Sequence, residues 1–406
     1  MRRARAAVSA LFLVNAVLFA NLVPRLPEVK DALGLSNAAL GTALAGMPAG
    51  ALVAGLFAPA VIGRFGSAKV ASLGLVGMGA VLVGVPAAGT WAGFAALLFV
   101  LGALDSIVDV AQNAHGFRVQ RRYGRSIINA FHGLWSAGAV LGGILGSIAA
   151  GLALPLRWHL TAAAVVFSGL ALVSLRFLLP GPEDTERTTA TANEGRSGAV
   201  GGPDGDDVAL LRRNGTVAAP RHTILLLAAL GVLAMAGSFV EDAGASWGAL
   251  FLRNEVGARA VFAGAAFVAL QSAMTVGRLT GDRFVDRYGQ RRIARVGGGL
   301  VAAGIALTLA VPSVVTTVAG FGAAGLGVAT LVPAVMHTAD ELPGLRPGVG
   351  LTVVSWLLRV GFLVSPPLIG VLADLTSLRA ALTVVVAAGV TIMVLGRILD
   401  GQDGAS

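Results

Sequence analysis

The chain has 406 residues, of which 56% are hydrophobic and only 13% are charged. Soluble domains carry about 25% charged residues, so too few charges are present here to cover a water-soluble surface. The mean hydropathy of +0.81 points the same way and excludes a soluble enzyme. The absence of Cys excludes disulfides, thiol nucleophiles and Cys-ligated metal sites.

Apolar runs long enough to cross a bilayer, about 20 residues each, recur twelve times along the chain. The first run follows three arginines like a signal peptide, but no small-residue cleavage site follows it cleanly, which favours a retained span. The expected spans are 7–23, 38–62, 70–89, 92–116, 127–152, 158–179, 222–247, 260–282, 292–311, 315–338, 348–372 and 378–399. The sequence therefore predicts an all-α membrane protein.

Basic residues are distributed unevenly between alternate loops. If the N-terminus is cytoplasmic, 21 of the 30 Lys and Arg residues fall in cytoplasmic loops and tails, and six, Arg25 among them, fall in external loops. This asymmetry follows the positive-inside rule and predicts a multi-pass protein of a bacterial-type cell membrane with both termini cytoplasmic. The net charge of +9 then lies against the anionic inner leaflet, so the expected partner is membrane lipid and not nucleic acid.

Residues 180–221 interrupt the pattern of spans. They contain no aromatic residue, seven acidic residues and five Arg. Such a segment cannot bury enough apolar surface to fold. It is expected to be a disordered cytoplasmic linker that joins two six-helix halves, residues 1–179 and residues 222–406, either as a plain tether or as a regulatory segment.

The two halves repeat each other at an offset of 223 residues, which aligns residues 63–69 with residues 286–292. Glycines also align across the halves: Gly34 with Gly257, Gly41 with Gly264, Gly74 with Gly297, Gly102 with Gly325, and Gly138 with Gly361. Two parallel six-helix repeats with a site between them near the midplane are one known transporter plan. The sequence thus predicts twelve transmembrane helices in two pseudo-symmetric six-helix bundles.

Residues 286–292 resemble the cytoplasmic loop motif of the major facilitator superfamily. The motif residues are Asp286, Arg287, Gly289, Arg291 and Arg292. The twelve spans, the inside termini and the long central linker agree with this resemblance over the whole chain. In the first half, Gly63 stands where the family pattern has Asp, and Ser67 and Ala68 stand where it has basic residues. The resemblance implies a secondary transporter of monomeric type.

Within this superfamily, three segments resemble the rhizopine-transporter-like branch of bacterial carriers. They are residues 241–243 with Trp247, residues 131–133, and Gly361 with residues 366–370. Ser246 precedes the tryptophan, where many members of the branch have a carboxylate. The resemblance implies a bacterial carrier and leaves its solute undefined.

Charged side chains within the expected spans are functional candidates, because they are costly in a bilayer unless they are paired or face water. Span 92–116 carries Asp105, Asp109, Gln112 and Asn113, and the first three form one polar stripe at helical spacing. Arg359 lies near the midpoint of its span, at about the depth of Asp105. Asp105, Asp109 and Arg359 have no counterpart of the same charge in the other half at the offset of 223, which favours a role in transport. A static buried ion pair and solvated groups in a wet cavity remain alternatives.

Asp105 and Asp109 are the leading candidates for proton coupling, followed by Glu241 and His132. Burial favours the protonated form of a carboxylic acid, and a nearby guanidinium favours the ionised form. Alternating exposure to two sides would therefore bind and release one proton per cycle, while Arg359 modulates the proton site or binds an anionic solute group. Glu241 could equally form an outer gate or extend to external water, and His132 could be a structural hydrogen-bonded histidine.

The candidate substrate-binding residues are Asn15, Gln112, Asn113, Trp135, Gln271 and Arg359. Amide side chains near the middle of a span can hydrogen-bond a polar solute, and they can equally join helices. A tryptophan such as Trp135 can stack on a ring of the solute or pack in the core.

The sequence therefore predicts a proton-coupled transporter of a small polar or amphipathic solute, with no cofactor and no metal. Neither lysine follows a glycine, as the lysine of a phosphate-binding loop does, and no His-Glu-x-x-His metalloprotease motif is present. Two alternatives remain. One is a drug or metabolite efflux antiporter of the same fold, and the other is a membrane sensor that binds its ligand without moving it.

Overall fold

The computed structural model describes residues 1–123, 127–181, 220–346 and 348–399, and all regular structure within them is helical. The predicted linker at 180–221 thus lies outside the described residues, except at its two ends. Pro180 and Gly181 follow the sixth membrane helix, and Arg221 is already the first residue of the seventh.

The first half of the chain contains six candidate membrane spans, some of which are built from consecutive shorter helices. The helices are α1 (Arg2–Ala20), η1 (Val23–Arg25), α2 (Leu26–Ala32), α3 (Asn37–Leu44), α4 (Gly46–Gly55), α5 (Ala58–Phe65), α6 (Ser67–Gly84), η2 (Val85–Ala87), α7 (Trp91–Tyr123), α8 (Ile128–Gly151) and α9 (Leu156–Leu175).

The second half contains the other six candidate spans. Its helices are α12 (Arg221–Asp242), the π-helical turn η3 (Ala243–Trp247), α13 (Gly248–Asn254), η4 (Ala260–Phe262), α14 (Ala265–Tyr288), α15 (Gln290–Ala310), α16 (Val314–Val328), α17 (Leu331–Asp340), α18 (Val349–Leu375), α19 (Leu378–Ala381), α20 (Thr383–Leu395) and η5 (Gly396–Ile398).

The prediction of twelve membrane spans is confirmed, because twelve helical segments in the described residues are long and apolar enough to cross a bilayer. Several of them are longer than the apolar runs indicated, and α7 and α14 are examples. Helix α7 continues to Tyr123, which places Arg118 on the helix and not in a loop, and α14 continues to Tyr288. Arg, Gln and Tyr do not interrupt a helix once it leaves the apolar layer, so hydropathy alone ends these elements too early.

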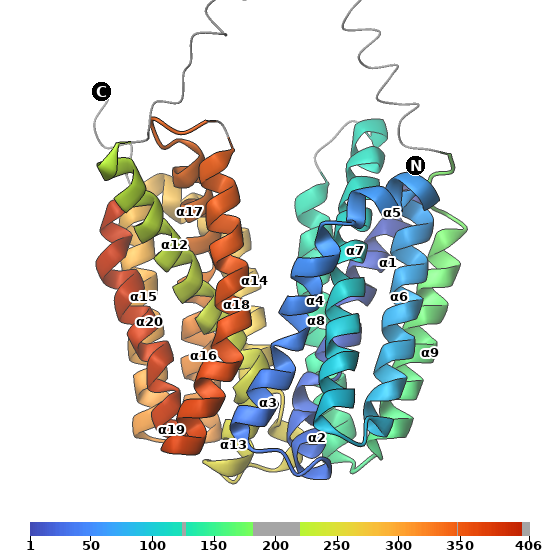
Figure 1. Cartoon of the computed structure of the whole chain (residues 1–406), viewed down its shortest axis with the longest axis horizontal. Coiled ribbons are helices and arrows are strands. Elements are labelled where there is room, and N and C mark those ends of the chain that lie inside the picture. Colours follow the sequence, from blue (N-terminus) through green and yellow to red (C-terminus); the bar gives the residue numbers. More distant parts are fainter. Residues whose placement is uncertain (124–126, 182–219, 347, 400–406) are drawn as a thin grey trace, which may run out of the picture.

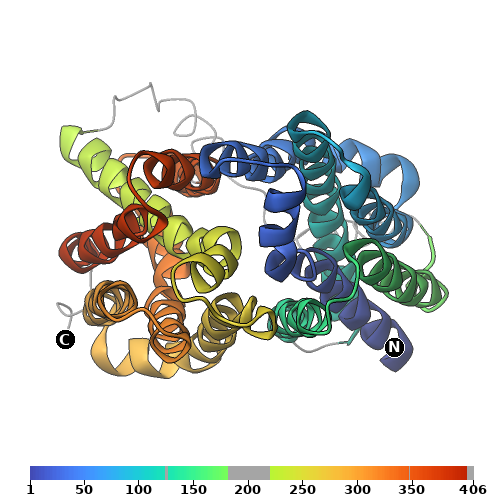
Figure 2. The same ribbon diagram turned by 90° about the horizontal axis from the view of Figure 1, so that it is seen from below.

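The two halves form two groups of helices that stand side by side (Figure 1; Figure 2, seen from below). Helix α1 begins and η5 ends on the same face of the molecule, at the top of Figure 1, which we call the terminal face. Helices α2, α13 and α19 lie on the other face, at the bottom, which we call the opposite face. The groups diverge toward the terminal face and meet at the opposite face (Figure 1).

The backbone shows the same internal repeat as the sequence. Gly66 between α5 and α6 has φ +80°, and Gly289 between α14 and α15, 223 positions later, has φ +77°. Gly34 and Gly257 form a second pair of this kind, with φ +61° and +66°. A positive φ is strained for residues with a side chain, which explains why glycine occupies both copies of each turn.

Helix packing repeats as well. Any Cβ at Gly102 on α7 would collide with the backbone of Met47, and one at Gly325 on α16 would collide with the backbone of Leu270. Met47 and Leu270 are themselves related by the offset of 223. Small residues let backbones approach closely, and here they set equivalent helix contacts in the two halves.

The halves are joined at the opposite face by backbone contacts between α3 and α18. Gly41 of α3 lies against the carbonyl of Pro366, and Gly370 of α18 lies against the carbonyl of Asn37. The carboxylate of Asp374 accepts hydrogen bonds from the backbone N–H groups of Asn37 (2.9 Å) and Ala38 (2.8 Å). It therefore caps the first turn of α3 from the other half of the protein.

Two further polar contacts join the halves at this face. Arg253 forms an ion pair with Asp31 at 2.7 Å. On the other side of the interface, the N–H of Gly264 donates to Ser147 Oγ of α8 at 2.9 Å. The opposite face is thus the side on which the two halves are closed against each other.

Arg25 is a correction to the sequence analysis, which placed it in an external loop. It is only 1% exposed and lies in η1, where its guanidinium donates to Glu28 (2.7 Å) and to the carbonyl of Leu154 (2.6 Å). The other contact is to the His159 ring nitrogen Nδ1 at 3.4 Å. Arg25 therefore holds the end of α1 to α9 within the first half and contributes nothing to a surface charge balance.

We predict that Asp374→Ala partly opens the opposite face. Charge-assisted hydrogen bonds contribute about 1.5–3 kcal/mol each, and solvent at this exposed site reduces that value, so we expect a shift of about 3- to 10-fold in the population of open molecules. The shift is measured as a longer distance between spin labels attached at Ala32→Cys and Ala380→Cys. No other position is labelled, because the native chain has no Cys. Asp340→Ala, on an exposed residue of the terminal face, is the control, and an unchanged distance in the Asp374 variant would contradict the prediction.

Candidate functional site

A central cavity of about 440 Å³ lies between the two halves, within the range of small-molecule sites. Its walls come from α1, α3, α4, α7 and α8 of the first half and from α12, η3, α14 and α18 of the second. It is lined by the predicted candidates Asn15, Asp105, Trp135, Glu241, Gln271 and Arg359. These residues are far apart in the sequence, and the fold gathers them around one space.

Asp105 of α7 is held in the cavity wall by a chain of hydrogen bonds. Asn15 of α1 donates from Nδ2 to Asp105 Oδ1 at 2.8 Å, and Trp135 of α8 donates from Nε1 to Asn15 Oδ1 at 2.7 Å. Asn15 is 3% exposed, so its amide has little access to competing water. The indole thus orients the amide, and the amide orients the carboxyl group.

Asp242 sits in the second half in a similar setting. It is 8% exposed, and it accepts hydrogen bonds from Ser246 Oγ and Ser365 Oγ, both at 2.7 Å. Ser246 belongs to the π-helical turn η3, which directly follows Asp242. π-turns inside helices are often found at functional sites. Here the turn and the adjacent α18 supply one hydroxyl donor to each carboxylate oxygen.

Glu241 and Arg359 line the same cavity without a hydrogen bond or ion pair to other residues of the described chain. Arg359 is exposed and Glu241 is partly buried. Gln271 of α14 is 4% exposed, and no hydrogen-bond donor from residues 1–123, 127–181, 220–346 or 348–399 reaches its Oε1. These three groups are therefore available to a molecule that enters the cavity.

The remaining polar candidates lie beside the cavity and do not line it. Asp109 accepts hydrogen bonds from Gln112 (3.3 Å) and Asn113 (3.1 Å) on its own helix. His132 and Arg359 are within electrostatic range of Asp109. Asp109 and His132 are both exposed. Asp109 follows Asp105 by one turn in the direction of Tyr123, where α7 ends, so it lies between the cavity and the terminal face.

The loop motif surrounds the tight turn between α14 and α15. Asp286 and Arg287 form the last turn of α14, Gly289 makes the turn, and Arg291 and Arg292 are in the first turn of α15. The four charged side chains are exposed at the terminal face, and Arg287 lies over the ring of Tyr288, 5.5 Å from its centroid. The motif is thus placed at the end of the molecule where the halves diverge.

Comparison with known proteins identifies the family. The model of the Major Facilitator Superfamily matches residues 8–246, which is more than half of the chain. This chain belongs to the Major Facilitator Superfamily. It is therefore a secondary transporter of a small molecule and not an enzyme, and a multi-pass membrane protein with bacterial relatives.

Relatives are similar over nearly their full length. "Membrane protein MosC" of Rhizobium meliloti is 30% identical over 389 residues, covering 95% of this chain and 88% of that protein. "Uncharacterized transporter y4wD" of Sinorhizobium fredii is 27% identical over 392 residues, covering 97% of both chains. The superfamily prediction is thus confirmed.

Solved structures confirm the transporter fold. A crystal structure of a variant of the nucleoside transporter NupG matches with a TM-score of 0.74 at 13% identity, over 97% of this chain and 99% of that one. A bacterial homologue of the human lysosomal transporter Spinster, in an inward-facing and occupied conformation, matches with a TM-score of 0.66 at 15% identity, over 97% and 95%. The predicted fold class of this superfamily member is confirmed.

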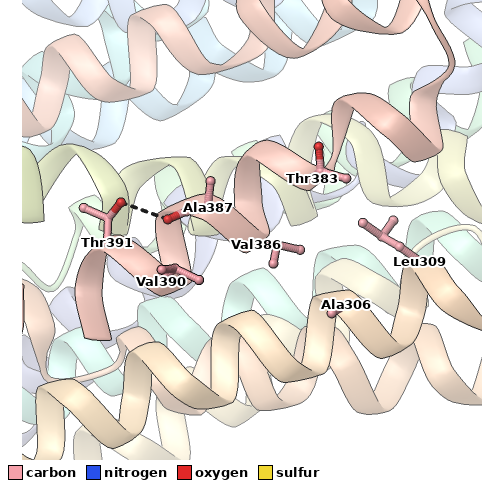
Figure 3. A pocket seen from close by; sticks show the side chains of 7 residues that line it. All are labelled: Ala306, Leu309, Thr383, Val386, Ala387, Val390 and Thr391. Atoms are coloured by element: carbon pink, nitrogen blue, oxygen red, sulfur yellow. Dashed lines mark hydrogen bonds between the residues drawn. The ribbon is translucent and has the colours of Figure 1, made fainter. Parts of the chain in front are cut away.

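A second, larger space of about 660 Å³ is a poorer candidate for the transport site. It lies between α15 and α20 and is lined by apolar side chains and two threonines (Figure 3). The hydroxyl of Thr391 donates to the carbonyl of Ala387 at 2.9 Å and is thereby satisfied. Both walls belong to the second half, so relative movement of the halves would not change access to this groove. Its surface suits lipid, and the central cavity is the site that a transporter of this superfamily requires.

Sequence reasoning did not select two residues of this site. Ser365 escaped notice because a serine in an apolar span gives no signal of its own, although it directly precedes Pro366 and Pro367. Asp242 was noticed beside Glu241 but not selected. The four-residue spacing from Asp242 to Ser246 is a usable signal, since residues at i and i+4 lie on one helical face.

We predict that Asn15→Leu lowers the stability of this transporter by about 1–3 kcal/mol, because it leaves the Asp105 carboxyl group and the Trp135 indole without a partner. Adding Asp105→Leu removes the unpaired carboxyl group and should recover part of the loss. Thermal unfolding in detergent micelles measures both variants, with Asn129→Leu on an exposed position of α8 as the control. Losses that simply add would show that Asn15 and Asp105 are not coupled.

Proposed function

We propose that this transporter moves a small polar or amphipathic solute together with protons, by alternating access to the central cavity, and that Asp105 carries the proton. The observation that supports this proposal is the position of Asp105 in the cavity wall, where, among the described residues, it is bonded to the neutral amide of Asn15 and to no guanidinium group. A carboxyl group with a neutral donor can exist with or without its proton, since Asn15 binds the oxygen in either form.

Asp109, one helical turn from Asp105, is proposed as the relay between the cavity and the terminal face. Asp109 is exposed on α7, and the nearby His132 of α8 is also exposed and can exchange protons with water. The positive charge of Arg359 on α18 acts on Asp109, whose side chain accepts hydrogen bonds from Gln112 and Asn113 on its own helix. Movement of α18 relative to α7 would change this influence and so link solute movement to proton release.

We propose that the terminal face is cytoplasmic. The arginines of the motif 286–292 and the N-terminal arginines all lie on it, as the positive-inside rule requires of a cytoplasmic surface. The described conformation, closed at the opposite face, is then open toward the cytoplasm of a bacterial cell. Residues 1–179 and 222–406 act as the two moving units of a monomer, and residues 180–221 tether them.

Two other functions within the same fold make different predictions. A drug or metabolite exporter would accept lipophilic cations, for which the aromatic walls at Phe19, Phe267 and Phe362 provide some support. A sensor would bind its ligand in the cavity without moving it. The transport assay below separates these functions from proton-coupled transport of a polar solute.

We predict that Asp105→Asn abolishes proton coupling and leaves solute exchange intact. The protein is reconstituted in liposomes that report internal pH, and a panel of polyols, amino acids, nucleosides and lipophilic cations is applied under an imposed membrane potential. One charge moving through 100 mV is worth about 2.3 kcal/mol, so a wild-type symporter accumulates solute more than about tenfold, and the variant only equilibrates it.

Asp340→Asn, on the exposed end of α17, is the matched control and should behave as wild type. Proton movement that persists in Asp105→Asn would remove Asp105 from the mechanism. Binding without flux for every solute of the panel would support the sensor, and flux of lipophilic cations alone would support the exporter.

The orientation makes a separate prediction. In intact cells, a membrane-impermeant thiol reagent should label Ala32→Cys at the opposite face and should not label Arg3→Cys at the terminal face. Both positions are exposed, and the native chain has no Cys to give a background signal. Permeabilised cells should label both variants. The reverse pattern in intact cells would place the termini outside.

A further inference from the structure

The unpartnered groups of the central cavity indicate what kind of solute it accepts. We infer that the cavity binds a small zwitterion, with Glu241 facing its ammonium group and Arg359 facing its acidic group. This inference rests on the proposed function, because it assigns a chemical class to the solute of the same cavity. It concerns binding, which can be measured whether or not transport occurs.

The charged groups that line the cavity divide into two kinds. Asp105 and Asp242 already have donors, one from Asn15 and two from serine hydroxyls. Glu241 and Arg359 have no hydrogen bond or ion pair in the described part of the chain. The available charges are therefore one carboxylate and one guanidinium, a balanced pair, even though acids outnumber bases in the lining.

Glu241 and Arg359 form no ion pair with each other in the described part of the chain, and their backbones lie at different depths. The bond between Ser365 and Asp242 fixes the register of α18 against α12, and the close approach of Gly361 to Ser238 agrees with it. Arg359 precedes Ser365 by six residues, which places its Cα about 9 Å nearer to the terminal face. A solute with charges at its two ends can bridge this separation.

Gln271 provides an independent observation. Its side chain is 4% exposed and lines the cavity, and its Oε1 atom receives no donor from the residues that the structure describes. An amide oxygen accepts hydrogen bonds only, so its partner must be a donor such as an ammonium or hydroxyl group. Gln271 belongs to the second half, as Glu241 does, and its oxygen is a second acceptor for the hydrogen-bond donors of a solute.

Asp109 does not supply the missing partner of Arg359. It is within electrostatic range of Arg359 but lies outside the cavity lining, and it already accepts hydrogen bonds from Gln112 and Asn113. His132 and Arg278, which also lie near this group, carry or can carry positive charge and offer no counter-ion to the guanidinium. An acidic group on the solute would supply one.

When the halves close around the solute, the charges of the solute determine how well it binds. In the described state Arg359 is exposed and water can solvate it. When the cavity closes, water is lost and an ionised group without a partner becomes costly. An amine would leave Arg359 unpaired, an acid would leave Glu241 unpaired, and a neutral solute would leave both. A zwitterion gives each of them a partner.

The test measures binding to the purified full-length protein with matched sets of probes. Each set contains a zwitterion and two singly charged counterparts of similar carbon skeleton: 4-aminobutyrate with butylamine and butyrate, 6-aminohexanoate with hexylamine and hexanoate, and phenylalanine with phenethylamine and 3-phenylpropionate. We expect at least one zwitterion to raise the unfolding temperature and to bind at least about 10-fold more tightly than both of its counterparts, since hydrogen bonds between charged groups have about this effect.

Two variants test the assignment of each charge. Glu241→Gln should weaken zwitterion binding about 10- to 100-fold and make the acid counterpart the better ligand, whereas Arg359→Gln should weaken it by a similar factor and make the amine the better ligand. Glu255→Gln and Arg259→Gln, in the loop before α14 and outside the cavity lining, are the matched controls. Unfolding temperatures without ligand establish that all four variants are folded.

The inference is overturned if no zwitterion binds, if an amine or an acid binds as tightly as its zwitterion, or if the two variants change selectivity in the same direction. These outcomes are separate from a failure of the proposed function. Zwitterion binding without flux in liposomes would reject transport and keep the zwitterion inference. Proton-coupled flux of other solutes, without zwitterion binding, would keep the proposed function and reject the zwitterion inference.

Discussion

A polar group inside a bilayer needs a hydrogen-bond or charge partner. This requirement divides the charged residues of the cavity into those with partners from the protein and those without. Where a carboxyl group is built into a wall, the protein supplies its donors, as Asn15 does for Asp105 and two serines do for Asp242. Where a charge faces the cavity, as Glu241 and Arg359 do, the partner must come from outside the protein. The four charged residues that line the cavity each fall into one of these two situations.

A repeated scaffold carries an unrepeated set of polar groups. The positive-φ glycines and the close helix contacts recur at the same offset in both halves, because each half must solve the same packing problem. The positions that correspond to Asp105 and Asp109 in the second half are Val328 and Val332. The apolar packing is thus duplicated, whereas the polar groups differ. The first half holds Asp105 with its Asn15 donor, and the second half holds Asp242 with its two serines as well as the unpartnered Glu241 and Arg359.

The sequence predicted the spans and the superfamily because both depend on local signals. An apolar run of about 20 residues identifies a span by itself, and a seven-residue motif identifies the loop. The helix ends at Tyr123 and Tyr288 were less predictable, since a helix can continue beyond the apolar layer. The burial of Arg25 was missed for a related reason, because its acceptor Leu154 lies 129 residues away and no local pattern announces it.

Within the site, the sequence predicted which residues line the cavity better than it predicted which side chains they contact. Six of the selected residues line the cavity, but the polar stripe of α7 divides, with Asp105 in the wall and Gln112 fully buried outside it. Which side of α7 faces the cavity depends on how the helix packs against α1 and α8, and helical spacing alone does not fix that rotation. The bond from Ser365 to Asp242 spans 123 residues and likewise depends on the packing of α18 against α12.

The cap that Asp374 places on α3 has a consequence for how the opposite face closes repeatedly. Its donors are backbone N–H groups, which every residue except proline provides, so side-chain changes at Asn37 and Ala38 leave them in place. The donors also need no rotamer search, because the first turn of α3 presents them in a fixed direction. This contact can break and re-form many times with only one side chain to reposition, and it tolerates side-chain changes at Asn37 and Ala38 while the carboxylate on α18 is kept.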